Sequence, residues 1–64
     1  MFAEHEVVIL VRDLPADGLT AGTLGTIVHV YDDHTFEVEF VTAGGGRTLA
    51  VTTVDAADLR PHTE

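Results

Sequence analysis

Along most of this chain apolar residues recur with a period of two, which is the spacing of half-buried β-strands. The clearest case is residues 35–41, where Phe36, Val38 and Phe40 fall on one face and glutamates fall on the other. Residues 6–11 form a nearly continuous β-branched run that is too short for a helix. The pattern predicts an all-β protein.

Turn-forming residues separate the strands. Pro15 and Gly18 lie in a weakly apolar stretch that predicts a long first loop, and the glycines at 44–46 predict a hairpin. Asp55 is a capping residue followed by too few helix formers for more than a single 3-10 turn before the last strand. The predicted strands are residues 6–11, 23–31, 35–41, 47–53 and a short one at 59–61, with a tight turn at Asp32-Asp33. We expect these five strands to curl into a small barrel, which protects the edges of the sheet.

The same alternation predicts which side chains fill the core. They are Val7, Ile9, Leu24, Ile27, Val30, Phe36, Val38, Phe40, Leu49, Val51 and Leu59. Gly25 predicts a bulge or a close backbone approach inside the second strand. Both faces of the first strand are apolar, so we expect an exposed patch with Val8, Leu10 and Val41, which a homodimer through that strand would cover.

Length and composition predict one folded domain over residues 1–64. Apolar residues make up 45% of the chain and charged residues 22%, which favours folding despite a net charge of −8. No run approaches the roughly 18 apolar residues of a membrane span, and the first residues lack the pattern of a signal peptide. We therefore expect a cytoplasmic protein that does not engage a membrane.

The composition lacks side chains that several kinds of catalysis and binding require. The chain has no serine, cysteine or lysine, and its 11 carboxylates outnumber 3 arginines. Such a surface repels phosphate backbones and attracts cations. We expect no enzymatic activity, no cofactor and no nucleic acid, and we expect a basic protein as the partner.

Short motifs in order along the chain carry a family resemblance. The segment from Gly22 to Val28 resembles the turn into a strand of KOW-type barrels. Asp13-Leu14-Pro15, Gly22 through Tyr31, residues 36–40 and Asp58-Leu59-Arg60-Pro61 resemble a bacterial family of small domains of unknown function, number 4926. The resemblance implies an SH3-like barrel and leaves the activity open. More distantly, the layout is similar to the barrel of nitrile hydratase β subunits, which packs on a partner subunit.

Acidic residues around one aromatic side chain form the candidate binding site. The residues are Tyr31, Asp32, Asp33, Glu37 and Glu39, all on the predicted hairpin of strands two and three. An aromatic side chain with an acidic surround can form the centre of a protein interface. The alternative is that these charges only keep a small apolar protein in solution.

Metal binding and acid–base catalysis are weaker interpretations of this hairpin. His29, Asp32, Asp33 and His34 offer metal ligands, but a turn at Asp32-Asp33 would place His29 opposite Phe36. Two glutamates about 7 Å apart on an exposed strand face have no pocket for a substrate. We therefore predict no metal site and no catalytic residue.

Three functions remain, from different classes. The first is a protein-binding module that covers a basic surface, most concretely an antitoxin or immunity-type protein. The second is an accessory subunit that packs on an enzyme through apolar contacts, and the third is a KOW-type RNA-binding domain. The acid excess favours the first and disfavours the third.

Overall fold

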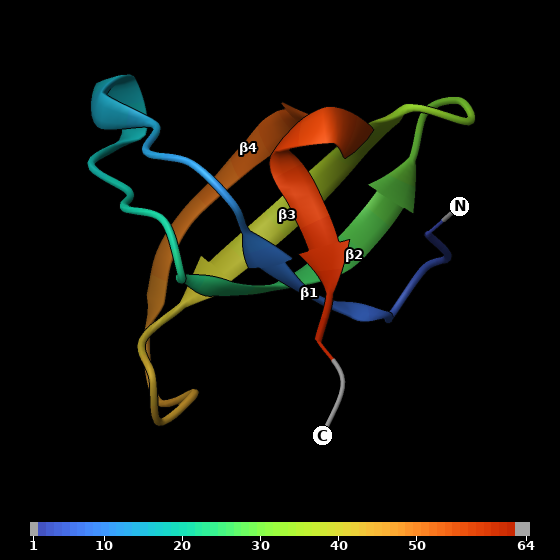
Figure 1. Ribbon diagram of the computed structural model, residues 1–64. Coiled ribbons are helices and arrows are strands. Elements are labelled where there is room, and N and C mark those ends of the chain that lie inside the picture. Colours follow the sequence, from blue (N-terminus) through green and yellow to red (C-terminus); the bar gives the residue numbers. More distant parts are fainter. Residues whose placement is uncertain (1, 63–64) are drawn as a thin grey trace.

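The computed structural model describes residues 2–62, and it confirms the all-β prediction (Figure 1). Five strands and two 3-10 turns follow one another along the chain. They are β1 (Val7–Leu10), η1 (Pro15–Asp17), β2 (Leu24–Val30), β3 (Thr35–Val41), β4 (Thr48–Asp55), η2 (Ala56–Asp58) and β5 (Leu59–Pro61). The turn before the last strand is as predicted, and η1 in the first loop is an addition. No helix long and apolar enough to cross a membrane occurs in the part of the chain that is described.

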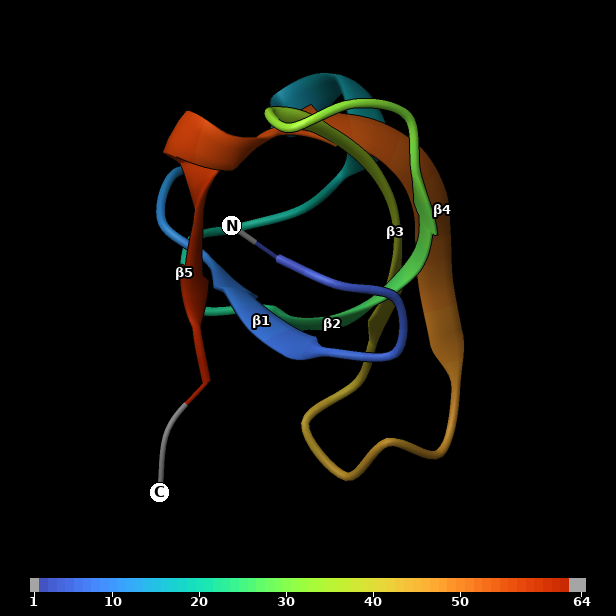
Figure 2. The same cartoon turned by 90° about the vertical axis from the view of Figure 1, so that its right-hand side faces the viewer.

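All five strands belong to a single antiparallel sheet in the order β4-β3-β2-β1-β5. The sheet curls strongly, so that β5 and β4 stand on opposite sides of the molecule (Figure 2). β1 lies between β2 and β5 and therefore has both of its edges paired. The two edge strands, β4 and β5, do not pair with each other, so strand pairing does not protect the edges of the curled sheet as expected.

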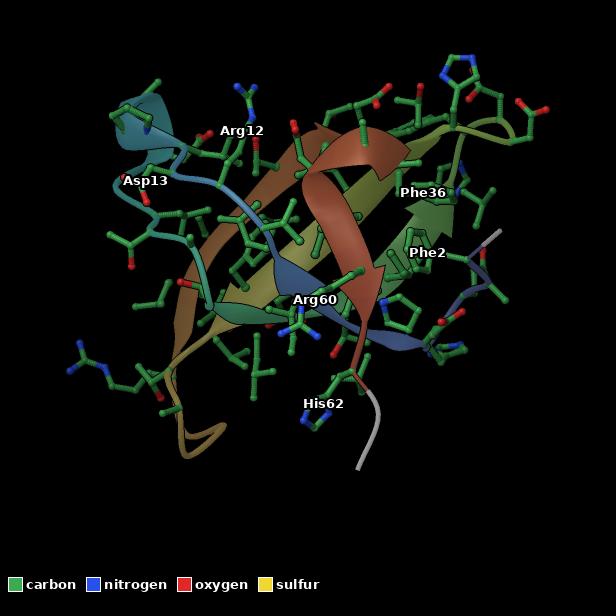
Figure 3. All side chains as sticks on the ribbon, in the orientation of Figure 1. Phe2, Arg12, Asp13, Phe36, Arg60 and His62 are labelled. Atoms are coloured by element: carbon green, nitrogen blue, oxygen red, sulfur yellow. The ribbon has the colours of Figure 1, made fainter. Side chains whose placement is uncertain are left out.

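The inner face of the curled sheet holds the core. Its buried apolar side chains are Val8, Leu10, Leu19, Ile27, Phe36, Val38, Phe40, Val54 and Leu59. Phe2 closes one end, with its ring edge-on to that of Phe36 at 5.5 Å between centroids and 76° between planes (Figure 3). The predictions for Ile27, Phe36, Val38, Phe40 and Leu59 are confirmed.

The core prediction chose the wrong face of β1. Val8 and Leu10 are fully buried, whereas Val7 is exposed and Ile9 is half-buried. The expected exposed patch of Val8, Leu10 and Val41 is therefore wrong, because Val41 is only half-buried and the other two fill the core. Because residues 6–11 are apolar on both faces, their sequence does not show which face is buried. Pairing with β2 and β5 decides which face points to the core.

On β4 the prediction also chose the wrong face. Leu49 and Val51 are 52% and 53% exposed, whereas Val54 is buried. The register explains this, because Ala50 lies opposite Phe40 and Val54 lies opposite Phe36. Residues opposite each other in a sheet share a face, and small side chains fit beside the two large rings. Leu24 and Val30 of β2, which were also expected in the core, are half-buried, and Val30 packs against it.

Gly25 confirms the predicted close approach in β2. A Cβ atom built there would lie 2.6 Å from Val38 Cγ1 and 2.9 Å from Phe40 Cδ1. The missing side chain leaves room for the side chains of Val38 and Phe40 against the backbone of β2. The register shift in this pair of strands lies elsewhere, between Ile27 and His29.

The first loop is folded back on itself. Leu14 and Leu19 exchange backbone hydrogen bonds of 2.9 and 3.1 Å around η1, and Gly18 takes the left-handed conformation that this turn requires. The fold of the loop brings Leu19 into the core, a burial that the sequence pattern did not reveal. Asp13 accepts a hydrogen bond from the backbone N–H of Ala21 and fastens the base of the loop.

Candidate functional site

The outward face of β3 carries two of the predicted site residues, Glu37 and Glu39. Glu37 lies opposite Thr53 of β4, and Glu39 lies opposite Val51. The Thr53 hydroxyl donates to Glu37 Oε1 at 2.8 Å, and the Thr48 hydroxyl donates to Glu39 Oε2. Both carboxylates are therefore held on the outside of the sheet beside β4.

Tyr31 joins this face from the end of β2. Its hydroxyl donates to Glu37 Oε1 at 3.3 Å, and the residue is 55% exposed. The ring of His29 packs edge-on against that of Tyr31 at 4.7 Å. His29 lies opposite Glu37 rather than Phe36 as expected, because the register shift after Ile27 adds one residue to β2.

The turn between β2 and β3 spans residues 31–34 and is longer than the predicted two-residue turn. Asp32 accepts the backbone N–H of His34 at 3.0 Å, an Asx-type contact that shapes the turn. This bond, and to a lesser extent the Thr35 hydroxyl and the His34 imidazole, hold the pKa of Asp32 below its usual value. Asp32 is thus a carboxylate at neutral pH with one side already occupied.

Asp33 and His34 complete the acidic turn. Ligand atoms of Asp32, Asp33 and His34 all lie within 4.8 Å of one another, and all three residues are exposed. The His34 ring also lies 3.7 Å from Asp55 at the end of β4. These groups could offer oxygen and nitrogen ligands, but all three are open to solvent, and exposed acidic groups are common without an ion.

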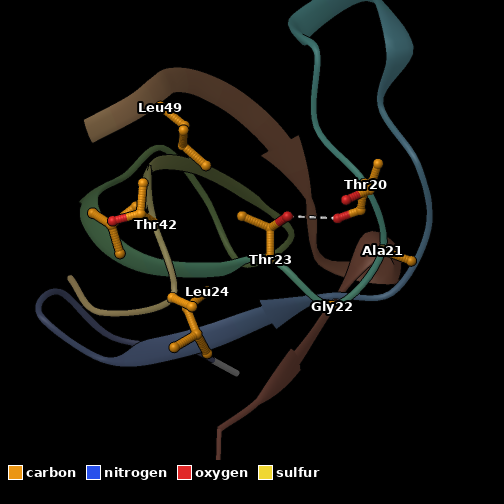
Figure 4. Close-up of a pocket in the computed structure, with 9 residues that line it drawn as sticks. Thr20, Ala21, Gly22, Thr23, Leu24, Thr42 and Leu49 are labelled. Atoms are coloured by element: carbon orange, nitrogen blue, oxygen red, sulfur yellow. Dashed lines mark hydrogen bonds between the residues drawn. The ribbon is translucent and has the colours of Figure 1, made fainter. Parts of the chain in front are cut away.

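A shallow hollow of about 390 Å³ lies at the other end of the same sheet face (Figure 4). Leu24, Val41 and Leu49 from three neighbouring strands form its apolar wall, and the base of the first loop forms its rim. The Thr23 hydroxyl donates to the Thr20 carbonyl there at 2.7 Å. None of the residues that line the hollow is titratable, so it offers no acid or base to a bound molecule.

The structure thus divides the predicted site into two parts. Tyr31, Glu37 and Glu39 share one sheet face, and Asp32 and Asp33 lie in the turn beside it. His29 belongs with the first part and was missed, although its position two residues before Tyr31 places both on one face of a strand. Glu37 and Glu39 are half-buried rather than exposed as expected, whereas Tyr31 is exposed. Such accessible carboxylates and an aromatic ring, with neighbouring threonine hydroxyls, can bind cationic side chains.

A comparison with known families identifies the chain. The model of DUF4926, a domain of unknown function, matches residues 4–61. The chain belongs to this family. No curated protein and no solved structure matches this DUF4926 chain. Its expected likeness to SH3-like and KOW-type barrels and to nitrile hydratase β subunits therefore stays a prediction.

Proposed function

We propose that this DUF4926 domain is a protein-binding module that recognises a basic surface on a partner, most concretely as an antitoxin or immunity-type protein. The observation that carries the proposal is the pair Glu37 and Glu39 on the outward face of the central strand β3, with Tyr31 at the end of β2 bonded to Glu37. Sites built on strands hold their side chains more accurately than sites on loops. A net charge of −8 adds long-range attraction for a basic partner.

The hydrogen bonds of the two glutamates leave room for a ligand. Both Tyr31 and Thr53 donate to the same oxygen of Glu37, and the bond from Thr48 falls on Oε2 of Glu39. Each carboxylate therefore keeps one oxygen without a partner among residues 2–62, already oriented by the bonds on the other. A preoriented carboxylate loses less side-chain entropy when it pairs with lysine or arginine.

A display library of random peptides, panned on the immobilised domain, tests this function without requiring the natural partner. We expect the enriched peptides to contain an excess of lysine and arginine, and their association to slow as salt is raised. Glu39→Gln should weaken binding several-fold, and Asp17→Asn, the same change of charge on η1 in the first loop, should have little effect at 150 mM salt. Peptides without basic enrichment, or equal effects of the two variants, would contradict the proposal.

The exposed side chains of Leu49 and Val51 favour a second candidate, an accessory role in which the domain packs on an enzyme subunit. Apolar association differs from charge recognition in two measurable ways. It depends little on salt, and it gives a negative heat-capacity change on binding. A partner whose binding shows both features would favour assembly over recognition of a basic surface.

A further inference from the structure

The free edge of β4 is the largest unsatisfied feature of the sheet. β4 pairs with β3 on one side, and along its other side it meets no strand among residues 2–62. Between Thr48 and Val54 the strand contains no charged residue and no proline, two of the devices that prevent a sheet edge from pairing, and its register shift with β3 lies at its start, between Thr48 and Ala50. An eight-residue strand of this kind is a template for another extended chain.

The register shows which backbone groups face this edge. Thr35 of β3 lies opposite Asp55 of β4, and just beyond this pair Ala56 N–H donates to the His34 carbonyl at 2.8 Å. A bond in that position shows that Thr35 and Asp55 do not hydrogen-bond to each other. The two types alternate along an antiparallel ladder. The N–H and C=O groups of Val51 and Thr53 therefore point away from β3 and toward the open edge.

The side chains next to this edge determine what fits there. An added strand lies about 4.8 Å beyond β4 and about 10 Å from β3. Its residues opposite Val51 and Thr53 would share rows with Glu39 and Glu37 respectively. The side chains of Val51 and Thr53 are short, so a lysine or arginine on the added strand can extend over them to the glutamate beyond.

We infer that the open edge of β4 binds an extended segment of the partner as an additional antiparallel strand, with basic residues at the alternate positions opposite Val51 and Thr53. The inference rests on the proposed function and specifies its mode. Backbone hydrogen bonds supply affinity in such strand addition, and the alternating side chains supply specificity. A second copy of this chain fits less well, because it brings the same charge of −8 to the same edge.

The backbone of a synthetic ligand provides the sharpest test, because it leaves the protein unchanged. The probe is the capped peptide Thr-Lys-Val-Lys-Val-Lys-Thr, with binding measured by calorimetry or fluorescence anisotropy. In the inferred geometry the lysine N–H groups point at β4 and the valine N–H groups point away from it. We expect N-methylation of the lysine amides to weaken binding at least about tenfold and N-methylation of the valine amides to change it little. Equal effects of the two methylation patterns would overturn the inference.

Two variants at the centre of the edge test the protein side. Val51→Pro removes the outward N–H without removing a bond to β3, and Val51→Thr keeps the N–H with a similar shape. We expect at least about a tenfold loss of peptide affinity in Val51→Pro and less than about a twofold change in Val51→Thr. If Val51→Pro does not fold, the methylated peptides decide the question on the unaltered protein.

The outcomes separate this inference from the proposed function. If the peptide binds in a salt-dependent way but neither Val51→Pro nor methylation changes its affinity, the domain still recognises basic ligands, and the edge of β4 is not where they bind. If neither this peptide nor any basic display peptide binds, the proposed function fails. If the domain instead forms dimers that Val51→Pro abolishes, as measured by analytical ultracentrifugation, the occupant is a second copy and the inference is wrong.

Discussion

β4 and β5 lie at opposite edges of one sheet, and they differ in the backbone hydrogen-bonding groups that they leave unpaired. β5 is three residues long and pairs with β1 on one side. The bonds from Val11 N–H to the Asp58 carbonyl and from His62 N–H to the Val7 carbonyl flank this pair of strands, so Leu59 and Pro61 direct their backbones outward. The Leu59 N–H donates to the Ala56 carbonyl of η2, and Pro61 has no N–H. The outer edge of β5 therefore has no donor to offer.

The two edges also differ in their side chains. Leu59 of β5 is buried in the core, whereas Leu49 and Val51 of β4 are more than half exposed. At the β5 edge, η2 and Pro61 leave no backbone donor for another strand. At the other edge, the eight-residue β4 has no strand along its outer side among residues 2–62. Because closing an edge needs only such small local devices, the open edge of β4 is a specific feature of this molecule rather than a general consequence of its size.

Truncating one leucine on each edge strand should produce the largest difference. We expect Leu59→Ala to lower the free energy of unfolding by about 2–4 kcal/mol, because it leaves a cavity in the core. Leu49→Ala removes an exposed side chain and should cost less than about 0.5 kcal/mol. Urea unfolding of the two variants measures both values, and similar losses would contradict the assignment of faces on the two edge strands.

The sequence predicted the centre of this fold better than its edges. β3 was predicted with its observed limits, because Phe36, Val38 and Phe40 alternate with polar residues and allow only one phase. β4 contains apolar residues on both faces, and the larger ones, Leu49 and Val51, suggested the wrong one. The face of β4 that is buried is determined by pairing with Phe36 and Phe40 of β3, and the sequence of β4 alone does not reveal it.

The candidate site shows the same limit. Alternation alone placed Glu37 and Glu39 together on the outward face of β3, and the structure agrees. The neighbours of these glutamates depended on pairing, because the extra residue after Ile27 brings His29 beside Glu37. The open edge of β4 could not be predicted, since the order of strands in the sheet and the direction of each N–H follow only from the complete register.

A methyl group added at Gly25 of β2 tests whether the two edge strands unfold together. Gly25→Ala places its Cβ against Val38 and Phe40, and we expect a loss of about 1–3 kcal/mol in unfolding free energy. Gly46→Ala is the matched control, because no atom lies within 4 Å of a Cβ built there. Both edges should lose hydrogen-exchange protection together in Gly25→Ala, and selective loss at β4 alone would show that the edges unfold independently.

An ion pair on the β5 side should contribute less. Arg12 Nε lies 2.8 Å from Asp58 Oδ1 and ties the first loop to η2 (Figure 3). The Arg12 side chain is 65% exposed and that of Asp58 is 17% exposed, so screening by water keeps the pair weak. A double-mutant cycle of Arg12→Ala and Asp58→Ala should give a coupling of about 0.2–1 kcal/mol that decreases in high salt. A coupling that is insensitive to salt would show that packing of the arginine stem holds η2 instead.

The smallest effect is expected where the acidic turn meets the end of β4. Asp32 fixes His34, and the His34 carbonyl accepts the N–H of Ala56 directly after β4. Because the folded protein holds the pKa of Asp32 below its usual value, the ionised carboxylate stabilises the fold above that usual value. This stabilisation is lost as the pH falls through the lowered pKa of the folded state. Relative to Asp32→Asn, which keeps an acceptor without a charge, the wild type should lose stability as the pH falls from neutral to values below the usual aspartate pKa of 3.8. Thermal unfolding of both proteins across that range measures the difference, and parallel curves would show that the charge of Asp32 contributes nothing to the turn that ends β4.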